Sequence, residues 1–409
     1  MNDLELRDVR VIDVAAGLSG DPVTLRLVDG RIGRIDPSPG ARARGFVMPG
    51  LIDTHVHLFF DGGPDPAGSY LQASDSDRLD VARRGAERAL AAGITTARDL
   101  GGPTAPAIAL ARRIDLGQLA GPRLVAAGSP ITRPGGHCHF FGGEVANPAE
   151  ARRLVDAQAA AGAGVVKVMV SGGGLTPGTR PDTVELPSDV LAAAVQAGHA
   201  NGLPVTAHCH ARAAIEAALE ARVDMIEHAS FVEPDGTVSI SSELLARIRA
   251  DGVVVGPTVA GALRTAARYR AAGRQADPDG RATIERLEAR ARIARALGEA
   301  GVTVLAGTDA GVTNTPSDVL VEELEAYRAV GFSTAEALRS ATLHAARGLR
   351  LANTGEVRAG WAADLLLLAA DPLQDVAALR KPLAVIRAGR VMAGSVGPTD
   401  PHSAGSASA

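Results

Sequence analysis

The sequence predicts an α/β protein, a (β/α)8 TIM barrel flanked by a small β-sandwich domain that is built from both termini. Three observations predict it. Strand-like segments alternate with helical segments across residues 49–350, short strands with tight turns occur at both ends of the chain, and metal-type side chains recur where the central strands end. The chain has 409 residues, so one large and one small domain are expected.

The composition suits this architecture and limits the classes of expected binding partner. Hydrophobic residues make up 46% of the chain and aromatic residues only 3%, which favours small side chains packed against a parallel sheet. The net charge of −4 comes without a basic run, so neither nucleic acid nor a membrane is an expected partner. The start of the chain, residues 1–7, lacks the apolar core of a secretory signal. We expect a cytoplasmic homo-oligomer that acts on a small-molecule substrate.

The two ends of the chain carry strand patterns that are too few to fold alone. Residues 4–47 contain short strands, and Asp29-Gly30 is predicted as a hairpin turn because both residues tolerate positive φ. Further strand patterns lie near the other terminus, within residues 363–391. The predicted domains are a β-sandwich from 1–48 and 351–393, a barrel from 49–350, and a disordered tail from 394–409.

The central region carries eight candidate strands separated mostly by helical patterns. The strands are predicted at 51–57, 94–100, 124–131, 165–171, 205–208, 224–228, 253–258 and 302–309. Asn147-Pro148 predicts a helix start, and Ser333 with Glu336 predicts a capping box for a helix that Gly348 follows. Residues 284–300 have the apolar spacing of an amphipathic helix.

Barrels of this kind carry their chemistry at the carboxyl ends of the strands. Those ends carry His55, His57, His208, His228 and Asp309, which are imidazoles and a carboxylate that zinc accepts. His55 and His57 alternate along a strand, so both side chains point to the same face. Each residue alone could be structural, since His208 could end a strand and Asp309 could cap a helix. Their joint occurrence at the ends of strands 1, 5, 6 and 8 favours a metal site.

Lys167 lies inside an otherwise apolar strand. A buried lysine is unfavourable unless it is neutralised or paired, so it could reach solvent or pair with Glu227. Reaction with carbon dioxide would instead give a carbamate, an anion with two oxygens that can bridge two metals. We therefore expect two divalent metal ions, with Zn²⁺ the leading candidate, and a carbon dioxide adduct on Lys167. The predicted ligands are His55, His57, Lys167, His208, His228 and Asp309.

These motifs together resemble the amidohydrolase superfamily, in the branch where a carboxylated lysine bridges two metals. The resemblance covers about residues 5–392. It is carried by Pro49–His57, Val166–Met169, Ala207–His210, Ile226–His228, Gly307–Gly311 and Gly360–Leu365. Within the superfamily, two further stretches, Gly135–Phe140 and Lys167–Gly174, are similar to the prolidase-like group. Imidazolonepropionase is similar around His55 and His57, but Lys167 argues against its mononuclear branch.

The prolidase-like group contains metal-dependent dipeptidases, carboxypeptidases of N-acyl amino acids and the amidases that open ochratoxin. The resemblance therefore implies hydrolysis of a peptide-like or N-acyl amino acid amide bond. The same site could instead act on a cyclic amide, lactone, carbamate or phosphotriester. The chain could also be a non-catalytic descendant that only binds, although the presence of all six metal-type residues argues against this.

Hydrolysis of an amide at neutral pH needs a nucleophile and an acid for the departing amine. A hydroxide shared by two metals supplies the nucleophile, because a metal lowers the pKa of bound water from about 15.7 toward about 7. Asp309 would accept the proton and deliver it to the departing nitrogen. Asp309 and Lys167 are therefore the catalytic candidates.

Three further histidines are candidates for holding the substrate. By resemblance, His137, His139 and His210 hydrogen-bond a substrate carbonyl or carboxylate, although they could instead support the metal ligands. Arg133 and Arg180 could clamp a substrate carboxylate or could be solvated surface charges. The loops expected to shape the pocket are 59–77, 171–185 and 312–317.

Overall fold

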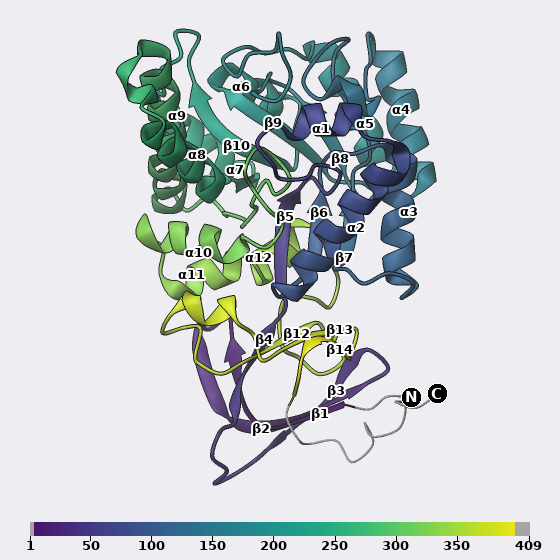
Figure 1. The fold of residues 1–409 in the computed structure, drawn as a ribbon, viewed down its shortest axis with the longest axis vertical. Coiled ribbons are helices and arrows are strands. Elements are labelled where there is room, and N and C mark those ends of the chain that lie inside the picture. Colours follow the sequence, from purple (N-terminus) through teal and green to yellow (C-terminus); the bar gives the residue numbers. More distant parts are fainter. Residues whose placement is uncertain (1–3, 397–409) are drawn as a thin grey trace.

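The computed structural model describes residues 4–396, which form an upper body of strands and helices and a lower β-sheet (Figure 1). The chain enters the upper body just after the lower sheet's strand β4 (Gly45–Pro49) and returns to the sheet near its end. The last strand, β14 (Arg390–Gly394), ends where the predicted disordered tail begins. Residues 397–409 of that tail lie outside the described residues.

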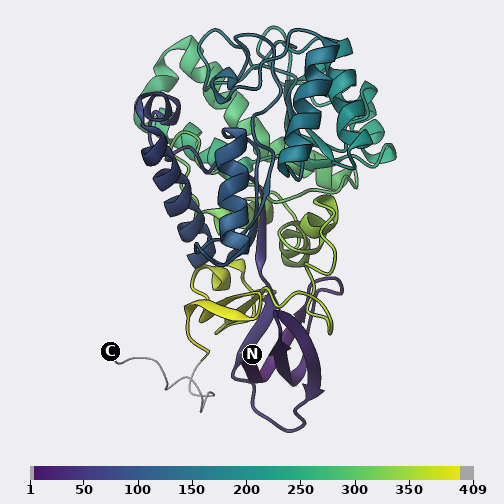
Figure 2. The same cartoon turned by 90° about the vertical axis from the view of Figure 1, so that its right-hand side faces the viewer.

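The lower sheet is built from both ends of the chain, and the turned view shows it lying below the helices (Figure 2). Its strand order is β14-β13-β12-β4-β1-β2-β3. The strands other than β4 and β14 are β1 (Leu4–Asp13), β2 (Leu18–Val28), β3 (Arg31–Pro37), β12 (Leu365–Leu368) and β13 (Ala384–Arg387). Because β4 pairs with β1 on one side and β12 on the other, the strands form one continuous sheet. Residues from both parts of this sheet, such as Leu25 and Leu365, share one buried core, and the β-sandwich stays a prediction.

The predicted hairpin turn is present between β2 and β3. Asp29 and Gly30 both have positive φ, 49° and 76°, as a tight turn between antiparallel strands requires.

The strands of the upper body form two parallel sheets, in the orders β5-β6-β7 and β11-β10-β9-β8. They are β5 (Leu51–Val56), β6 (Ile94–Asp99), β7 (Arg123–Ala126), β8 (Val166–Met169), β9 (Val205–Ala211), β10 (Met225–Val232) and β11 (Val254–Gly256). Every residue of β5, β6 and β10 is buried, as expected for parallel strands covered on both faces. The prediction of alternating strands and helices is confirmed, with different bounds for most strands.

The eighth predicted strand, 302–309, is present only as single parallel bridges. Val304 bridges to Val255 of β11, and Ala310 bridges to Val56 of β5. Near the end of this segment the amide of Thr308 donates to the Asp53 carboxylate (3.1 Å), so that amide is engaged by a side chain instead of a ladder partner. The described strands of the upper body therefore form two separate sheets and not one closed sheet.

Helices cover the outside of these strands (Figures 1 and 2). They are α1 (Pro66–Gln72), α2 (Asp75–Ala91), α3 (Thr104–Asp115), α4 (Pro148–Ala161), α5 (Ser188–Ala200), α6 (Arg212–Glu220), α7 (Ser242–Ala250), α8 (Val259–Ala271), α9 (Pro278–Glu299), α10 (Leu320–Ala329), α11 (Thr334–Ser340) and α12 (Leu343–Gly348). Helices α8 and α9 form a hairpin on the side of the body opposite α3 and α4 (Figure 1). Across residues 4–396, no helix has both the length and the apolar character needed to cross a bilayer.

Two helix starts follow the predicted local chemistry, and one helix end does not. Asn147 accepts the amide hydrogen of Glu150, and Ser333 with Glu336 forms the predicted capping box. The helix expected after Ser333 is divided into α11 and α12, and Gly348 is the last residue of α12 and not the residue after it. A Cβ at Gly348 would lie 2.8 Å from Leu305 Cδ1, so close packing accounts for the glycine.

Candidate metal centre

Three of the predicted ligands meet where β5 ends, and we call them the Asp309 cluster: His55, His57 and Asp309. The Oδ1 atom of Asp309 lies 3.2 Å from Nε2 of His55 and 3.2 Å from Nε2 of His57. Asp309 reaches this position with a positive φ of 57°, while its amide donates to the carbonyl of His55 (2.8 Å). Strand alternation and one unusual backbone conformation thus bring three potential ligand atoms together.

The hydrogen bonds of His55 determine which of its nitrogens is free. Its Nδ1 atom lies 3.0 Å from Glu227 Oε2, and Glu227 also accepts from Arg98 Nη2 (2.6 Å). Burial raises the pKa of Glu227, but Arg98 and His55 outweigh that effect and hold the pKa well below its usual range. Glu227 is therefore an ionised acceptor, and Nδ1 of His55 must carry the hydrogen that it donates.

The remaining nitrogen of His55 faces a negative oxygen without a proton between them. Burial lowers the pKa of His55 to about 4, so the ring is neutral at pH 7 and its Nε2 bears a lone pair. Burial raises the pKa of Asp309, but His55, His57 and Lys167 outweigh that effect, so the carboxylate is ionised. A lone pair and a carboxylate oxygen 3.2 Å apart repel each other unless a cation lies against both. The donor set therefore fits a bound divalent metal.

A second group, the His228 cluster, consists of His208 and His210 at the end of β9 and His228 on β10. Their ligand atoms lie within 4.8 Å of one another, and the rings of His208 and His228 have centroids 4.6 Å apart. Strands β9 and β10 pair in parallel with His228 opposite Cys209, which places the three imidazoles at the same sheet end. His228 also has a positive φ, 69°.

The members of the His228 cluster differ in the nitrogen that they leave free. His208 Nε2 lies 3.3 Å from the carbonyl of Gly172, so a proton there leaves Nδ1 available. His228 Nδ1 lies 2.8 Å from Thr258 Oγ1, so a proton there leaves Nε2 available. Both arrangements suit a metal ligand, because a neutral imidazole binds through its unprotonated nitrogen.

His210 differs from His208 and His228, because the nitrogen that it leaves free carries a hydrogen. Arg290 Nη2 lies 3.1 Å from His210 Nδ1, and a guanidinium can only donate, so Nδ1 is the acceptor. Burial, followed by the charge of Arg290, lowers the pKa of His210 well below its usual value. The neutral ring therefore carries its hydrogen on Nε2. His210 presents a hydrogen-bond donor, where His208 and His228 present lone pairs.

Lys167 lies on β8, beside strand β9 of the His228 cluster. Its side chain is 1% exposed, and among the described residues its Nζ has no hydrogen-bond partner. Burial lowers the pKa of Lys167 to about 8, and its charge in turn lowers the pKa of both His55 and His208. A buried, unpartnered amine that acts on both clusters fits a group modified to bind cations.

Three buried titratable residues support the centre and were not predicted as site residues. Glu227 braces His55, and Arg98 braces Glu227 while its Nε donates to the carbonyl of Thr54 (2.6 Å). Asp53 accepts from the amide and hydroxyl of Thr308, beside Asp309. The signal in the sequence was a charged residue inside an apolar strand pattern, the same signal that singled out Lys167.

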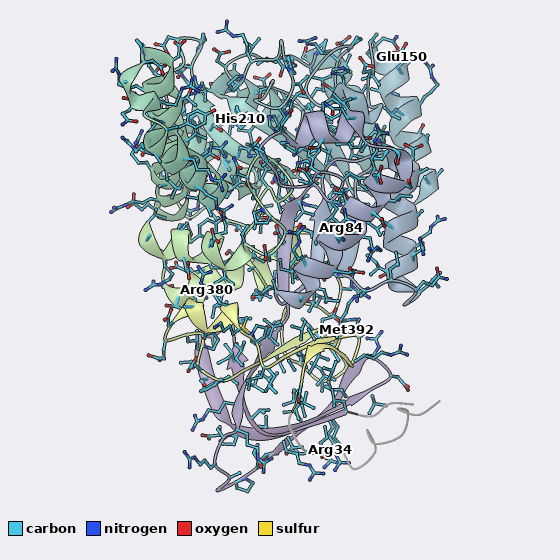
Figure 3. All side chains as sticks on the ribbon, in the orientation of Figure 1. Arg34, Arg84, Glu150, His210, Arg380 and Met392 are labelled. Atoms are coloured by element: carbon cyan, nitrogen blue, oxygen red, sulfur yellow. The ribbon has the colours of Figure 1, made fainter. Side chains whose placement is uncertain are left out.

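A cavity of about 350 Å³ opens above the centre. His137 and His210, two of the three predicted substrate-binding histidines, line it together with Asp309. His139 does not line it; this residue lies in a 3-10 turn, with Nδ1 3.1 Å from the carbonyl of Gly136. His137 is buried, and its Nδ1 has no partner among the described residues. Figure 3 places His210 in the upper body, away from the lower sheet that Arg34 marks.

Two of the three predicted loops contribute to the cavity. Loop 171–185 supplies Gly174, Leu175 and Pro181, and loop 312–317 supplies Val312 to Thr315, whereas loop 59–77 supplies none of the lining.

The two arginines predicted as possible clamps do not line the cavity. Arg133 pairs with Glu185 (3.3 Å) and Arg180 with Asp182 (2.6 Å), so both guanidinium groups already have a carboxylate partner. The lining arginines come instead from the α8–α9 hairpin, as Arg268, Arg286 and Arg290.

The α/β fold carries two clusters of potential metal ligands at the ends of its parallel strands. A sequence profile of the Amidohydrolase family matches residues 46–392, and the chain belongs to this family, so it is a metal-dependent hydrolase that acts on amide bonds.

Several known proteins are similar over nearly the full chain. An uncharacterised protein of Mycobacterium tuberculosis is 33% identical over 374 residues, which cover 90% of this chain and 91% of the relative. Ochratoxinase of Aspergillus niger is 28% identical, over 83% of this chain and 73% of the relative. A crystal structure of a Xaa-Pro dipeptidase with bound methionine superposes with a TM-score of 0.85 at 24% identity, covering 95% and 99% of the two chains. This last similarity supports the fold alone.

Proposed function

We propose that the chain hydrolyses the amide bond of a dipeptide or N-acyl amino acid. In this proposal two divalent metals, with zinc the leading candidate, are held by the six predicted ligands, and Lys167 is carboxylated. The proposal depends on one observation. The unprotonated Nε2 of His55 faces the Asp309 carboxylate, and the buried Lys167 at the same centre has no hydrogen-bond partner among the described residues. The motifs that resemble the prolidase-like group and the similarity to ochratoxinase favour an amide as the bond.

Two metals held by the six predicted ligands would, when bound, supply an acidified water and polarise the scissile carbonyl. Asp309 is ionised and lines the cavity, so it accepts the proton of the attacking water. It then delivers that proton to the amide nitrogen as the carbon–nitrogen bond breaks, which gives a carboxylic acid and a free amine. His210 donates from Nε2 to the substrate, and His137 lines the same wall of the cavity.

The isolated bridges of the upper body bear on whether its two sheets belong to one barrel. Single parallel bridges, Ile131 to Val168 and Val255 to Val304, link the two sheets of the upper body to neighbouring segments. We propose that these segments complete a (β/α)8 barrel over 49–350, with 1–48 and 351–393 as a separate β domain.

The proposed function is tested with a substrate library and a metal-free control. The protein is stripped with a chelator, reconstituted with zinc in bicarbonate buffer, and assayed against dipeptides, N-acyl amino acids, lactones, carbamates and phosphotriesters. We expect turnover of one or more amides that disappears on chelation and returns with zinc. Turnover of the other bonds without any amide would overturn the proposal, as would amide turnover that survives complete metal removal.

A further inference from the structure

The part of the cavity wall that helices α8 and α9 form is positively charged. Helices α8 and α9 place Arg268, Arg286 and Arg290 in the lining, and among residues 4–396 Asp309 is the one carboxylate that lines the cavity. Asp309 already faces two ligand histidines in the Asp309 cluster. The arginine wall therefore has no carboxylate of its own across the cavity, and a substrate that enters it meets excess positive charge.

Arg290 is buried without a carboxylate in direct contact. It is 7% exposed, and it donates to Thr258 Oγ1 (2.9 Å), to the carbonyl of Pro257 (2.7 Å) and to His210 Nδ1 (3.1 Å). All three acceptors are neutral, and within residues 4–396 no carboxylate lies within ion-pair distance of this guanidinium. The carboxylates that act on Arg290 through their charge, Asp309 and Glu323, do so without a direct contact, and an arginine stays charged at neutral pH. A buried cation of this kind favours an anionic ligand.

Two arginines of α8 outside the lining are paired with acids. Arg270 of α8 makes two bonds to Glu288 of α9 (2.8 and 2.9 Å), and Arg264 bonds to Glu322. Arg286 has only the hydroxyl of Thr283 (3.1 Å) as a side-chain partner in the described chain. Arg264 and Arg270, outside the lining, thus have carboxylate partners, whereas Arg286 and Arg290 in the lining have no ion pair in the described chain.

The spacing of the lining arginines suits a ligand with two negative groups. Arg286 and Arg290 are four residues apart on α9, so they lie on the same helix face one turn apart. Arg290 is the inner of the two, because it contacts His210 at the metal centre. Arg286 is therefore one turn farther from the reacting bond, with Arg268 of α8 also in the lining.

We propose that the α8–α9 hairpin forms a dicarboxylate subsite and that the substrates are N-acyl or dipeptide amides whose leaving residue is glutamate or aspartate. This inference rests on the proposed function. Arg290 binds the α-carboxylate beside the scissile amide, and Arg286 with Arg268 binds the side-chain carboxylate. Two carbon atoms separate the two carboxylates of aspartate, and three separate those of glutamate. This short separation suits neighbouring guanidinium groups on one helix face.

The test compares an acidic substrate with its uncharged counterpart. For the zinc-reconstituted enzyme, kcat/KM is measured for N-acetyl-L-glutamate and N-acetyl-L-glutamine. A charge-assisted bond to a guanidinium favours the acid by about 10-fold or more. Arg286→Gln is expected to remove this preference by lowering kcat/KM for the glutamate substrate alone. Arg292→Gln is the matched control, since Arg292 is an exposed arginine of α9 outside the lining, and its preference should equal that of the wild type.

A binding measurement separates failure of the subsite from failure of the proposed reaction. Calorimetry of L-glutamate and L-glutamine with the zinc-loaded wild type needs no turnover, and we expect glutamate to bind about 10-fold more tightly. Equal kcat/KM or equal affinity for the acid and the amide in the wild type overturns the subsite, as does an Arg286→Gln variant that loses both substrates equally. Hydrolysis of other N-acyl amino acids would then leave the proposed function standing. Selective glutamate binding without hydrolysis of any amide supports the subsite and overturns the reaction.

Discussion

The two ligand clusters are supported in different ways. In the Asp309 cluster, His55 donates to Glu227, an ionised carboxylate that Arg98 holds from the other side. In the His228 cluster, the second nitrogens of the rings meet a hydroxyl, a carbonyl and a guanidinium, at Thr258, Gly172 and Arg290. One cluster is braced by a negative charge and the other by neutral groups beside a positive charge.

This difference predicts two metal sites of unequal affinity. A carboxylate that accepts from a ligand imidazole raises the basicity of the nitrogen that binds the metal. A hydroxyl or carbonyl acceptor does so less, and the nearby charge of Arg290 opposes a cation. We expect the metal at the Asp309 cluster to bind more tightly, and the metal at the His228 cluster to leave first on chelation.

The largest expected effect comes from Asp309→Asn. The amide keeps an oxygen for the metal but cannot accept the proton of the attacking water, so kcat should fall by about 10²- to 10⁴-fold. Metal content should stay close to that of the wild type when both proteins are reconstituted in excess zinc. Near-normal turnover in the metal-replete variant would refute the role of Asp309 as a base.

Glu227→Gln removes the charge that braces the Asp309 cluster. It leaves Arg98 buried without its ionic partner, which costs about 3–5 kcal/mol of folding stability. The variant should also bind the tighter metal about 10- to 100-fold more weakly. Denaturant unfolding of the metal-free protein and metal competition assays measure the two effects separately. An unchanged affinity with lowered stability would mean that Glu227 supports the fold and not the metal.

The pH dependence of folding stability tests the role of Glu323, which holds the backbone next to Thr258, the hydrogen-bond partner of His228. Its carboxylate accepts the amides of Val259 (2.8 Å) and Ala260 (2.6 Å), next to Thr258. Burial raises the pKa of Glu323 from 4.5 to about 7 despite these bonds. The unfolded chain loses this proton near pH 4.5 and the folded chain near pH 7. The contribution of Glu323 to stability therefore falls as pH rises between these values, by on the order of 3 kcal/mol.

The Glu323→Gln variant isolates that contribution. Comparing unfolding free energies of the wild type and the variant at pH 5 and pH 7.5 should show a smaller decline with pH in the variant. Parallel pH profiles for the two proteins would contradict a raised pKa at Glu323.

Thr258→Val has the smallest expected effect. It removes the hydroxyl near His228 Nδ1 and an acceptor of Arg290 while keeping the shape of the side chain. We expect the weaker metal to lose a few-fold in affinity, equivalent to about 1 kcal/mol, with the tighter metal unaffected. A loss as large as that of Glu227→Gln would remove the proposed difference between the clusters.

Much of the site was predictable because it depends on local patterns. His55 and His57 share a face through strand alternation, and Lys167 stands out in an apolar strand, so the sequence places them without tertiary information. The helix starts at Asn147 and Ser333 followed equally local rules. The prolidase-like motif also led to His137, which lines the cavity.

The parts that were missed depend on contacts between distant segments. Arg286 and Arg290 look like ordinary helix charges until the α8–α9 hairpin folds over the strand ends. Arg133 and Arg180 lie in plausible loops, yet nearby acids neutralise them. The eighth strand was expected as regular, but the contact of Asp53 with Thr308 replaces part of its ladder.

The most direct test of the account is the metal content of the wild type and of Lys167→Ala after reconstitution with zinc in bicarbonate buffer. We expect about two zinc ions per wild-type chain, the number that a bridged pair requires. Lys167→Ala should lose at least the weaker-bound ion, because the bridging anion is absent. Fewer than one zinc per wild-type chain, or an unchanged count in the variant, would contradict the bridged metal centre.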